Sequence, residues 1–203
     1  MIAPKVASEI DDVNYIVMLA GPGINGDKLM LSQKAALERI MGLNEMQIAQ
    51  GQNFLKGAYD IIVESNLDNI KLKDSINSFF INKYSDLLPE NQRKAIVNQI
   101  TEYEIVSLLK SKPSIYLSKV KCPILALNGC KDFQVPAKEN LQAIKKILVE
   151  SGNKNVETLE LENLNHLFQE CKTGVSNEYS QIEQTISPAV LELITGWIKE
   201  QTK

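Results

Sequence analysis

One stretch of the sequence constrains the fold more than any other: an apolar run followed by a loop that carries a carboxylate. Residues 124–127 are apolar, with Pro123 before them and an Asn-Gly pair after them. Such a run is typical of a parallel strand that is covered on both faces. In open α/β sheets, ligands and catalytic groups lie just beyond the carboxyl ends of the strands. Asp132 follows the run at that position, so we expect its carboxylate to belong to a functional site.

The one histidine of the chain offers a partner for this carboxylate. His166 follows a second strand-like segment, residues 156–161. An acid after one strand and a histidine after the next match the last two members of a Ser-Asp-His series. In such a triad the histidine takes the proton of a serine hydroxyl, and the acid orients the imidazole. A lone histidine in a loop is more often structural, but this placement favours catalytic roles for Asp132 and His166.

The other segments predict an α/β fold with a helical insertion. An apolar run at 14–20 predicts a further buried strand, and amphipathic helices are expected at 136–151 and 186–201. Strands and helices that alternate with short connections indicate a parallel sheet with right-handed crossovers. Apolar residues recur at helical spacing between the first two strands. We therefore expect a parallel sheet of about three strands with flanking helices, formed by residues 1–26 and 112–203, and an all-helical insertion at 27–111.

A glycine-rich segment follows the first of these strands. Gly21-Pro-Gly-Ile-Asn-Gly26 has the glycine spacing of a dinucleotide-binding loop. A nucleotide-binding βαβ unit closes within about 30 residues, whereas the next strand here comes about a hundred residues later. No strand after the helix offers an acid for a ribose. We interpret the segment as a flexible exit into the insertion and expect no cofactor.

Composition excludes several classes of function. The net charge is −3 and the isoelectric point is near 5.4, without a basic stripe, so nucleic acid is not an expected partner. No apolar run approaches the roughly 20 residues that a membrane-spanning helix needs. One histidine and no Cys-x-x-Cys spacing provide no recognised metal-ligand set. The sequence has three widely spaced cysteines, Cys122, Cys130 and Cys171. This pattern is typical of free thiols in a reducing compartment, for which the cytoplasm is the default expectation, although the formation of one disulfide stays an open alternative.

The nucleophile of a triad is missing from the sequence. No Gly-x-Ser-x-Gly motif occurs in it. Ser151 and Ser176 lie close to glycines, but neither follows a strand and precedes a helix, as an exposed nucleophile requires. On the residues alone, the chain carries an acid and a histidine without a serine for them to activate.

Five stretches, taken in order, resemble the C-terminal part of an α/β-hydrolase: residues 1–7, 18–23, 120–129, 131–136 and 164–169. The similarity is to the bacterial serine esterase and dienelactone hydrolase-like group, which is related to prolyl oligopeptidase-type hydrolases. In that group the nucleophile lies in a Gly-His-Ser-x-Gly-Gly elbow that runs into a helix often beginning Ile-Ala-Pro, as residues 2–4 read here.

The resemblance implies a partial α/β-hydrolase fold in which the helices of 27–111 form a variable cap. It implies that Asp132 is the catalytic acid and His166 the catalytic histidine. The substrate would be a small-molecule ester or a related acyl compound, and the nucleophilic serine would lie upstream of Met1. The chain alone is then expected to be inactive.

Three interpretations of the chain remain open at this point. It is a fragment of an otherwise ordinary esterase, a fragment of a serine peptidase on the same fold, or a short product that serves as a non-catalytic binding or assembly module.

The first strand suggests how such a chain would associate. Without the strand that precedes the nucleophile in the related fold, residues 14–20 would form an open, apolar edge. We expect a homodimer or a higher assembly through residues 1–20, because a two-fold strand pair is the simplest closed solution. The alternative is that the inserted helices fold back and cover the edge.

Overall fold

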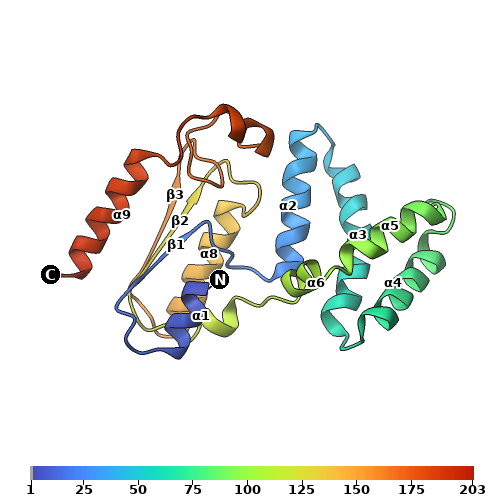
Figure 1. Ribbon diagram of the computed structural model, residues 1–203, viewed down its shortest axis with the longest axis horizontal. Helices are drawn as coiled ribbons and strands as arrows, with labels where there is room; N and C mark the ends of the chain where they lie inside the picture. The colour runs from blue at the N-terminus through green and yellow to red at the C-terminus, as the bar shows by residue number, and fades with distance from the viewer. Residues whose placement is uncertain (1) are drawn as a thin grey trace. The chain divides into compact units, whose positions relative to one another are not determined.

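The computed structural model describes residues 2–203 of the chain, and Figure 1 shows its helices and strands. The chain divides into two compact units. Unit 1 contains the sheet and comprises the chain up to Ile24 together with Lys112–Lys203, whereas unit 2 comprises Asn25–Ser111 and is helical. Both residues predicted to be catalytic, Asp132 and His166, belong to unit 1.

Unit 1 is built on a parallel sheet of three strands, β1 (Ile16–Leu19), β2 (Ile124–Gly129) and β3 (Val156–Leu161). β2 lies in the middle, and its first residue, Ile124, pairs with Val156 of β3. Every residue of β2 is buried, as expected for a parallel strand that is covered on both faces. The predicted parallel α/β sheet of about three strands is confirmed, and β2 runs two residues past its predicted end.

Helices cover both faces of this sheet (Figure 1). One face carries α8 (Ala137–Glu150), the N-terminal helix α1 (Ile2–Glu9) and the short α7 (Ser114–Leu117), and the other face carries α9 (Pro188–Gln201). The flanking helices predicted from the sequence are therefore also confirmed. Within residues 2–203, no helix is both long and apolar enough to cross a membrane.

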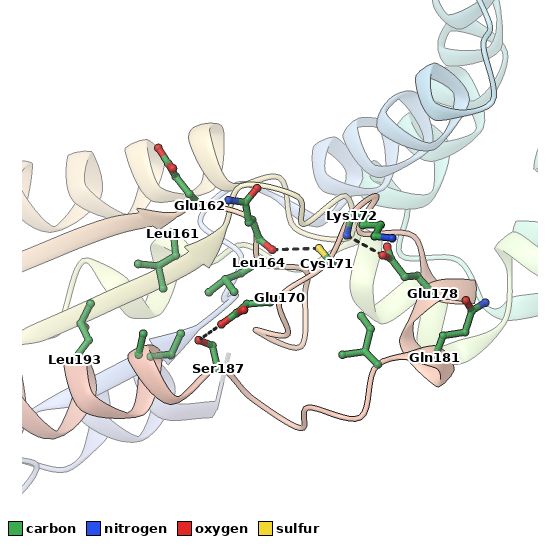
Figure 2. A pocket seen from close by; sticks show the side chains of 14 residues that line it. Leu161, Glu162, Leu164, Glu170, Cys171, Lys172, Glu178, Gln181, Ser187 and Leu193 are labelled. Carbon is green, nitrogen blue, oxygen red and sulfur yellow. Dashed lines mark hydrogen bonds between the residues drawn. The ribbon is translucent and has the colours of Figure 1, made fainter.

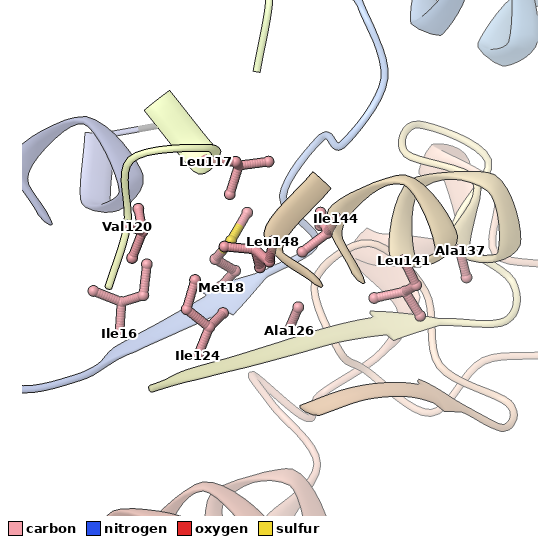
Figure 3. Packing of buried hydrophobic residues seen from close by; sticks show 10 residues of the cluster. All are labelled: Ile16, Met18, Leu117, Val120, Ile124, Ala126, Ala137, Leu141, Ile144 and Leu148. Carbon is pink, nitrogen blue, oxygen red and sulfur yellow. The ribbon is translucent and has the colours of Figure 1, made fainter. Parts of the chain in front are cut away.

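The core on the α8 side shows why this helix forms and where it packs (Figure 3). Ile144 and Leu148 are four residues apart, so they lie on one face of α8, and both are fully buried. They join Met18 of β1 and Ile124 of β2 in one apolar cluster. Truncation of a side chain buried in this way costs about 2–5 kcal/mol, so the cluster holds α8 firmly on the sheet.

Unit 2 has a separate apolar core of its own, in which Ile76 and Phe80 are fully buried. A capping box between Asn44 and Gln47 starts its longest helix, because each side chain accepts a hydrogen bond from the other residue's backbone N–H. Its helices are α2 (Gly26–Ile40), α3 (Glu45–Glu64), α4 (Asn69–Tyr84), α5 (Glu90–Ile100) and α6 (Tyr103–Leu109). Whether unit 2 acts as a cap stays a prediction.

The glycine-rich segment after β1 has a structural role at Gly23. The backbone N–H groups of Gly23 and Ile24 donate hydrogen bonds to the buried side-chain oxygen of Asn140 in α8, at 2.8 and 3.3 Å. A Cβ atom at residue 23 would lie 2.3 Å from the Asn140 backbone oxygen. Only glycine therefore allows the chain to approach α8 this closely.

Candidate catalytic site

The carboxyl ends of β2 and β3 bring Asp132 and His166 together. The Asp132 Oδ2 atom lies 2.8 Å from the Nδ1 atom of His166, which is hydrogen-bond distance. Each residue sits in the loop after its strand, and the two strands are direct neighbours in the sheet. The two residues predicted from the sequence therefore form one contact, although they are 34 positions apart in the chain.

Backbone groups hold the Asp132 carboxylate in a single orientation. Its Oδ1 atom accepts hydrogen bonds from the N–H groups of Gln134 and Val135, both at 2.9 Å. The carboxylate is fully buried, whereas the His166 side chain retains 28% of its exposure. Backbone N–H groups therefore fix the carboxylate in the interior, whereas solvent can reach the imidazole.

A buried asparagine supports the same carboxylate. The Asn128 side-chain amide donates to Asp132 Oδ2 at 3.3 Å and to the backbone oxygen of Val135 at 2.8 Å. Asn128 is completely buried in β2, and its Oδ1 atom has no partner among the described residues. From the sequence, Asn128 is expected only to mark the boundary after the strand. A polar side chain closing a fully apolar strand was the signal for its supporting role.

Gly129 lets the His166 loop lie directly against the end of β2. A Cβ atom at this position would come within 2.1 Å of the Leu164 backbone oxygen. That oxygen also accepts a hydrogen bond from the Lys131 N–H group at 3.0 Å. This close approach explains why the loops after β2 and β3 lie next to each other and bring Asp132 and His166 together.

The residue before the histidine organises its loop. Asn165 is completely buried, and its Oδ1 atom accepts hydrogen bonds from the backbone of Leu167 at 2.9 Å and of Gln169 at 3.0 Å. Its amide also donates to the Gln169 side chain at 2.9 Å. Phe168 adopts a φ of +58° while buried in the core. These constraints fix the backbone that presents His166.

Tyr179 reaches the same site from the short 3₁₀ helix η1 (Ser176–Gln181). The Gln134 side-chain amide donates to its hydroxyl at 3.2 Å. Burial raises the pKa of Tyr179, and the charge of Asp132 raises it further, against hydrogen bonds from Gln134 and the His166 backbone. The raised pKa keeps the phenol protonated at neutral pH. The sequence contained no signal for it, because η1 lies in a polar stretch without regular spacing.

A glutamate anchors the loop that carries Tyr179 (Figure 2). The Glu178 carboxylate accepts hydrogen bonds from the backbone of Lys172, Thr173 and Gly174 at 2.7–3.0 Å. The Thr173 hydroxyl donates as well, at 2.5 Å. The Thr173 hydroxyl, followed by these N–H groups, lowers the pKa of Glu178 from 4.5 to about 2. The loop is therefore tied to an ionised side chain.

A pocket of about 680 Å³ lies beside this loop, next to α9 (Figure 2). Leu164, Val190 and Leu193 contribute apolar surface to it, and Glu162 and Glu170 contribute carboxylates. Neither Asp132 nor His166 lines it. We therefore locate the candidate chemistry at the Asp132–His166 pair, where two titratable groups meet in defined geometry, and not in this pocket.

The pair can supply the general base of a nucleophilic mechanism, with His166 as the base and Asp132 as the acid that orients it. With Nδ1–H donated to Asp132, the Nε2 atom of His166 has a free lone pair that can accept a proton. Within the described part of unit 1, no serine, threonine or cysteine is hydrogen-bonded to the imidazole. No group of three or more metal-ligating side chains occurs among residues 2–203. In the part of unit 1 that the structure describes, an acid and a base are therefore in contact, without a nucleophilic side chain hydrogen-bonded to the base.

Comparisons with known proteins add no family assignment. No family model matches the chain, and neither the curated proteins nor the solved structures contain a match to it. Nothing in these comparisons links the chain to the α/β-hydrolases.

Proposed function

We propose that this chain supplies the acid and the histidine of a serine hydrolase that acts on small-molecule carboxylic esters. The observation that carries the proposal is the 2.8 Å contact between Asp132 and His166, on neighbouring loops at the carboxyl edge of a parallel sheet. The nucleophilic serine would come from outside these 203 residues.

Each residue of the pair has a defined role in this proposal. His166 Nε2 accepts the proton of the attacking serine hydroxyl and then returns it to the leaving alkoxide. Asp132 holds Nδ1–H and stabilises the imidazolium that forms. The hydrogen bonds from Gln134 and Val135 to Asp132 support this assignment, because they keep the acid in place while the imidazole changes charge.

The purified chain provides the first test. Without a serine nucleophile, it should hydrolyse p-nitrophenyl acetate no faster than a free imidazole does, and it should not react with a fluorophosphonate. Turnover by the chain that both His166→Ala and the fluorophosphonate abolish would show that a nucleophilic hydroxyl lies within the 203 residues, and the proposed division of the triad would be wrong.

A longer gene product provides the second test. If the reading frame continues upstream through a Gly-His-Ser-x-Gly-Gly sequence, the longer protein should hydrolyse the ester and react with a fluorophosphonate at that serine. Asp132→Asn should then lower kcat by about 10⁴-fold, whereas Asp11→Asn, at an exposed position, should leave it unchanged. A stop codon directly upstream, or an Asp132→Asn variant with full activity, would contradict the proposal.

A further inference from the structure

The sheet of unit 1 has two open edges, and they differ in chemistry. β1 and β3 are the outer strands, and each is paired on one side only among the described residues. β3 carries Glu157 and Glu160, both exposed. Charged side chains on an edge strand oppose its pairing with another strand. The segment 13–26, which contains β1, has no charged residue before Asp27, so only the β3 edge is protected in this way.

The backbone of β1 presents a row of groups that a further strand could bind. The N–H group of Ile16 donates to the oxygen of Pro123, directly before β2, at 3.0 Å, and that of Ala20 donates to Leu127 of β2 at 2.8 Å. Because these groups alternate in direction along a strand, the N–H and C=O groups of Tyr15, Val17 and Leu19 point away from β2. Among the described residues, β1 pairs with β2 alone, so these outward-facing groups have no strand partner.

Apolar side chains are exposed on the same part of unit 1. Leu19 of β1 is 46% exposed, and Ile2, Val6 and Ile10 of the preceding segment are 82%, 38% and 51% exposed. Ile2 and Val6 are four residues apart in α1 and lie on one face of the helix, and the N–H group of Ile10, directly after the helix, donates to the Val6 oxygen at 2.9 Å. α1 packs into the same core cluster as β1. The uncharged edge of β1 and these exposed apolar side chains therefore belong to the same N-terminal part of unit 1.

We propose that β1 binds the β1 strand of a second copy of this chain, in antiparallel orientation. A two-fold axis lets one interface cover both β1 edges. It also requires an antiparallel pair, because only there do two outward-facing residues exchange both of their hydrogen bonds. Self-pairing of β1 brings no like charges together, whereas self-pairing of β3 would set carboxylates against each other. The proposal concerns the 203-residue chain and does not depend on its catalytic role; in a longer protein, a strand from an upstream segment would compete with the partner subunit for the same β1 edge.

The outward-facing residues also determine the register. The arrangement that uses all three is centred on Val17, which then pairs with Val17 of the partner subunit. Tyr15 pairs with Leu19 on either side of this centre. The pairs join a β-branched residue to its equivalent and an aromatic ring to an aliphatic side chain, combinations that stabilise neighbouring strands. The two sheets would become one continuous sheet.

Multi-angle light scattering over a wide concentration range tests the dimer. The wild-type protein should show twice the chain mass of 22.7 kDa and dissociate on dilution. Leu19→Lys should raise the dimer Kd at least about tenfold, since both copies then lose the apolar contact of Leu19 and bring an ammonium group into an interface in which β1 offers no carboxylate to pair with it. Leu191→Lys is the matched control, because Leu191 is equally exposed, at 48%, but lies on α9. It should leave the Kd unchanged.

A proline variant separates strand pairing from general surface contact. Val17→Pro removes one outward N–H group from each copy and leaves the hydrogen bonds of the Ile16 and Ala20 N–H groups in place. It should give a monomer with the circular dichroism of the wild type. If Val17→Pro fails to fold, Leu19→Lys still decides the question. A wild-type monomer at every concentration, or a dimer that Leu19→Lys leaves intact, would overturn the proposal.

Discussion

At the scale of single residues, the Glu178 carboxylate makes the stability of its loop depend on pH. Its pKa in the folded protein is about 2, below the ordinary 4.5. A lowered pKa means that the carboxylate stabilises the fold above about pH 4.5 and that this contribution is lost as the pH falls toward 2. We expect Glu178→Gln to lower the melting temperature at pH 7 and to have little effect near pH 2, measured by circular dichroism.

Glu183→Gln is the control for this prediction. Glu183 is exposed and lies five residues further along the same segment, so its substitution should leave the melting temperature unchanged at both pH values. Equal effects of the two substitutions at pH 7 would show that the loss of a negative charge, and not the hydrogen bonds to residues 172–174, causes the change.

At the scale of the strands and loops, two glycines should respond to alanine with opposite signs. Gly129→Ala places a Cβ atom 2.1 Å from the Leu164 backbone oxygen, so we expect a loss of about 1–3 kcal/mol in unfolding free energy. In Gly196→Ala the new Cβ meets no atom within 4 Å. Gly196 lies inside α9, where alanine should gain about 0.5–1 kcal/mol. Urea unfolding measures both changes.

The same pair of variants tests whether Gly129 positions the histidine loop. Because the chain has a single histidine, the deshielded proton between His166 Nδ1 and Asp132 can be assigned directly by NMR. This signal should disappear in Gly129→Ala and persist in Gly196→Ala. A retained signal in Gly129→Ala would mean that the loop can shift without separating the pair.

The bounds of β3 and α9 show how much of the local structure the sequence can predict. β3 has its predicted bounds, because a short run with β-branched and apolar residues between polar loops has few alternatives. α9 begins at Pro188, two residues later than predicted, since proline is accepted in the first turn of a helix and disfavours helical backbone before it. Asp132 and His166 could be predicted to lie close together from strand order alone. The sequence signals Asn128 only as a polar residue at the end of an apolar run, without its partners, and it carries no signal for Tyr179, because the contacts of Tyr179 are tertiary and leave no regular spacing.

At the scale of the whole molecule, the three apolar clusters predict two separately stable units. The clusters around Ile144 and Trp197 contain residues of unit 1 only, and the cluster around Ile76 contains residues of unit 2 only. The chain passes between the units twice, at 24–25 and 111–112. A cavity in one core should therefore weaken that unit and leave the other unchanged.

Ile144→Ala and Ile76→Ala form a matched pair for this prediction, because both isoleucines have 0% exposure. Each substitution should cost about 2–5 kcal/mol in its own unit. Hydrogen exchange followed by mass spectrometry should then show faster exchange in β1, β2 and α8 for Ile144→Ala, and in α3, α4 and α5 for Ile76→Ala. If both variants accelerate exchange throughout residues 2–203 to the same extent, the chain unfolds as one cooperative unit, and the two-unit interpretation of its stability is wrong.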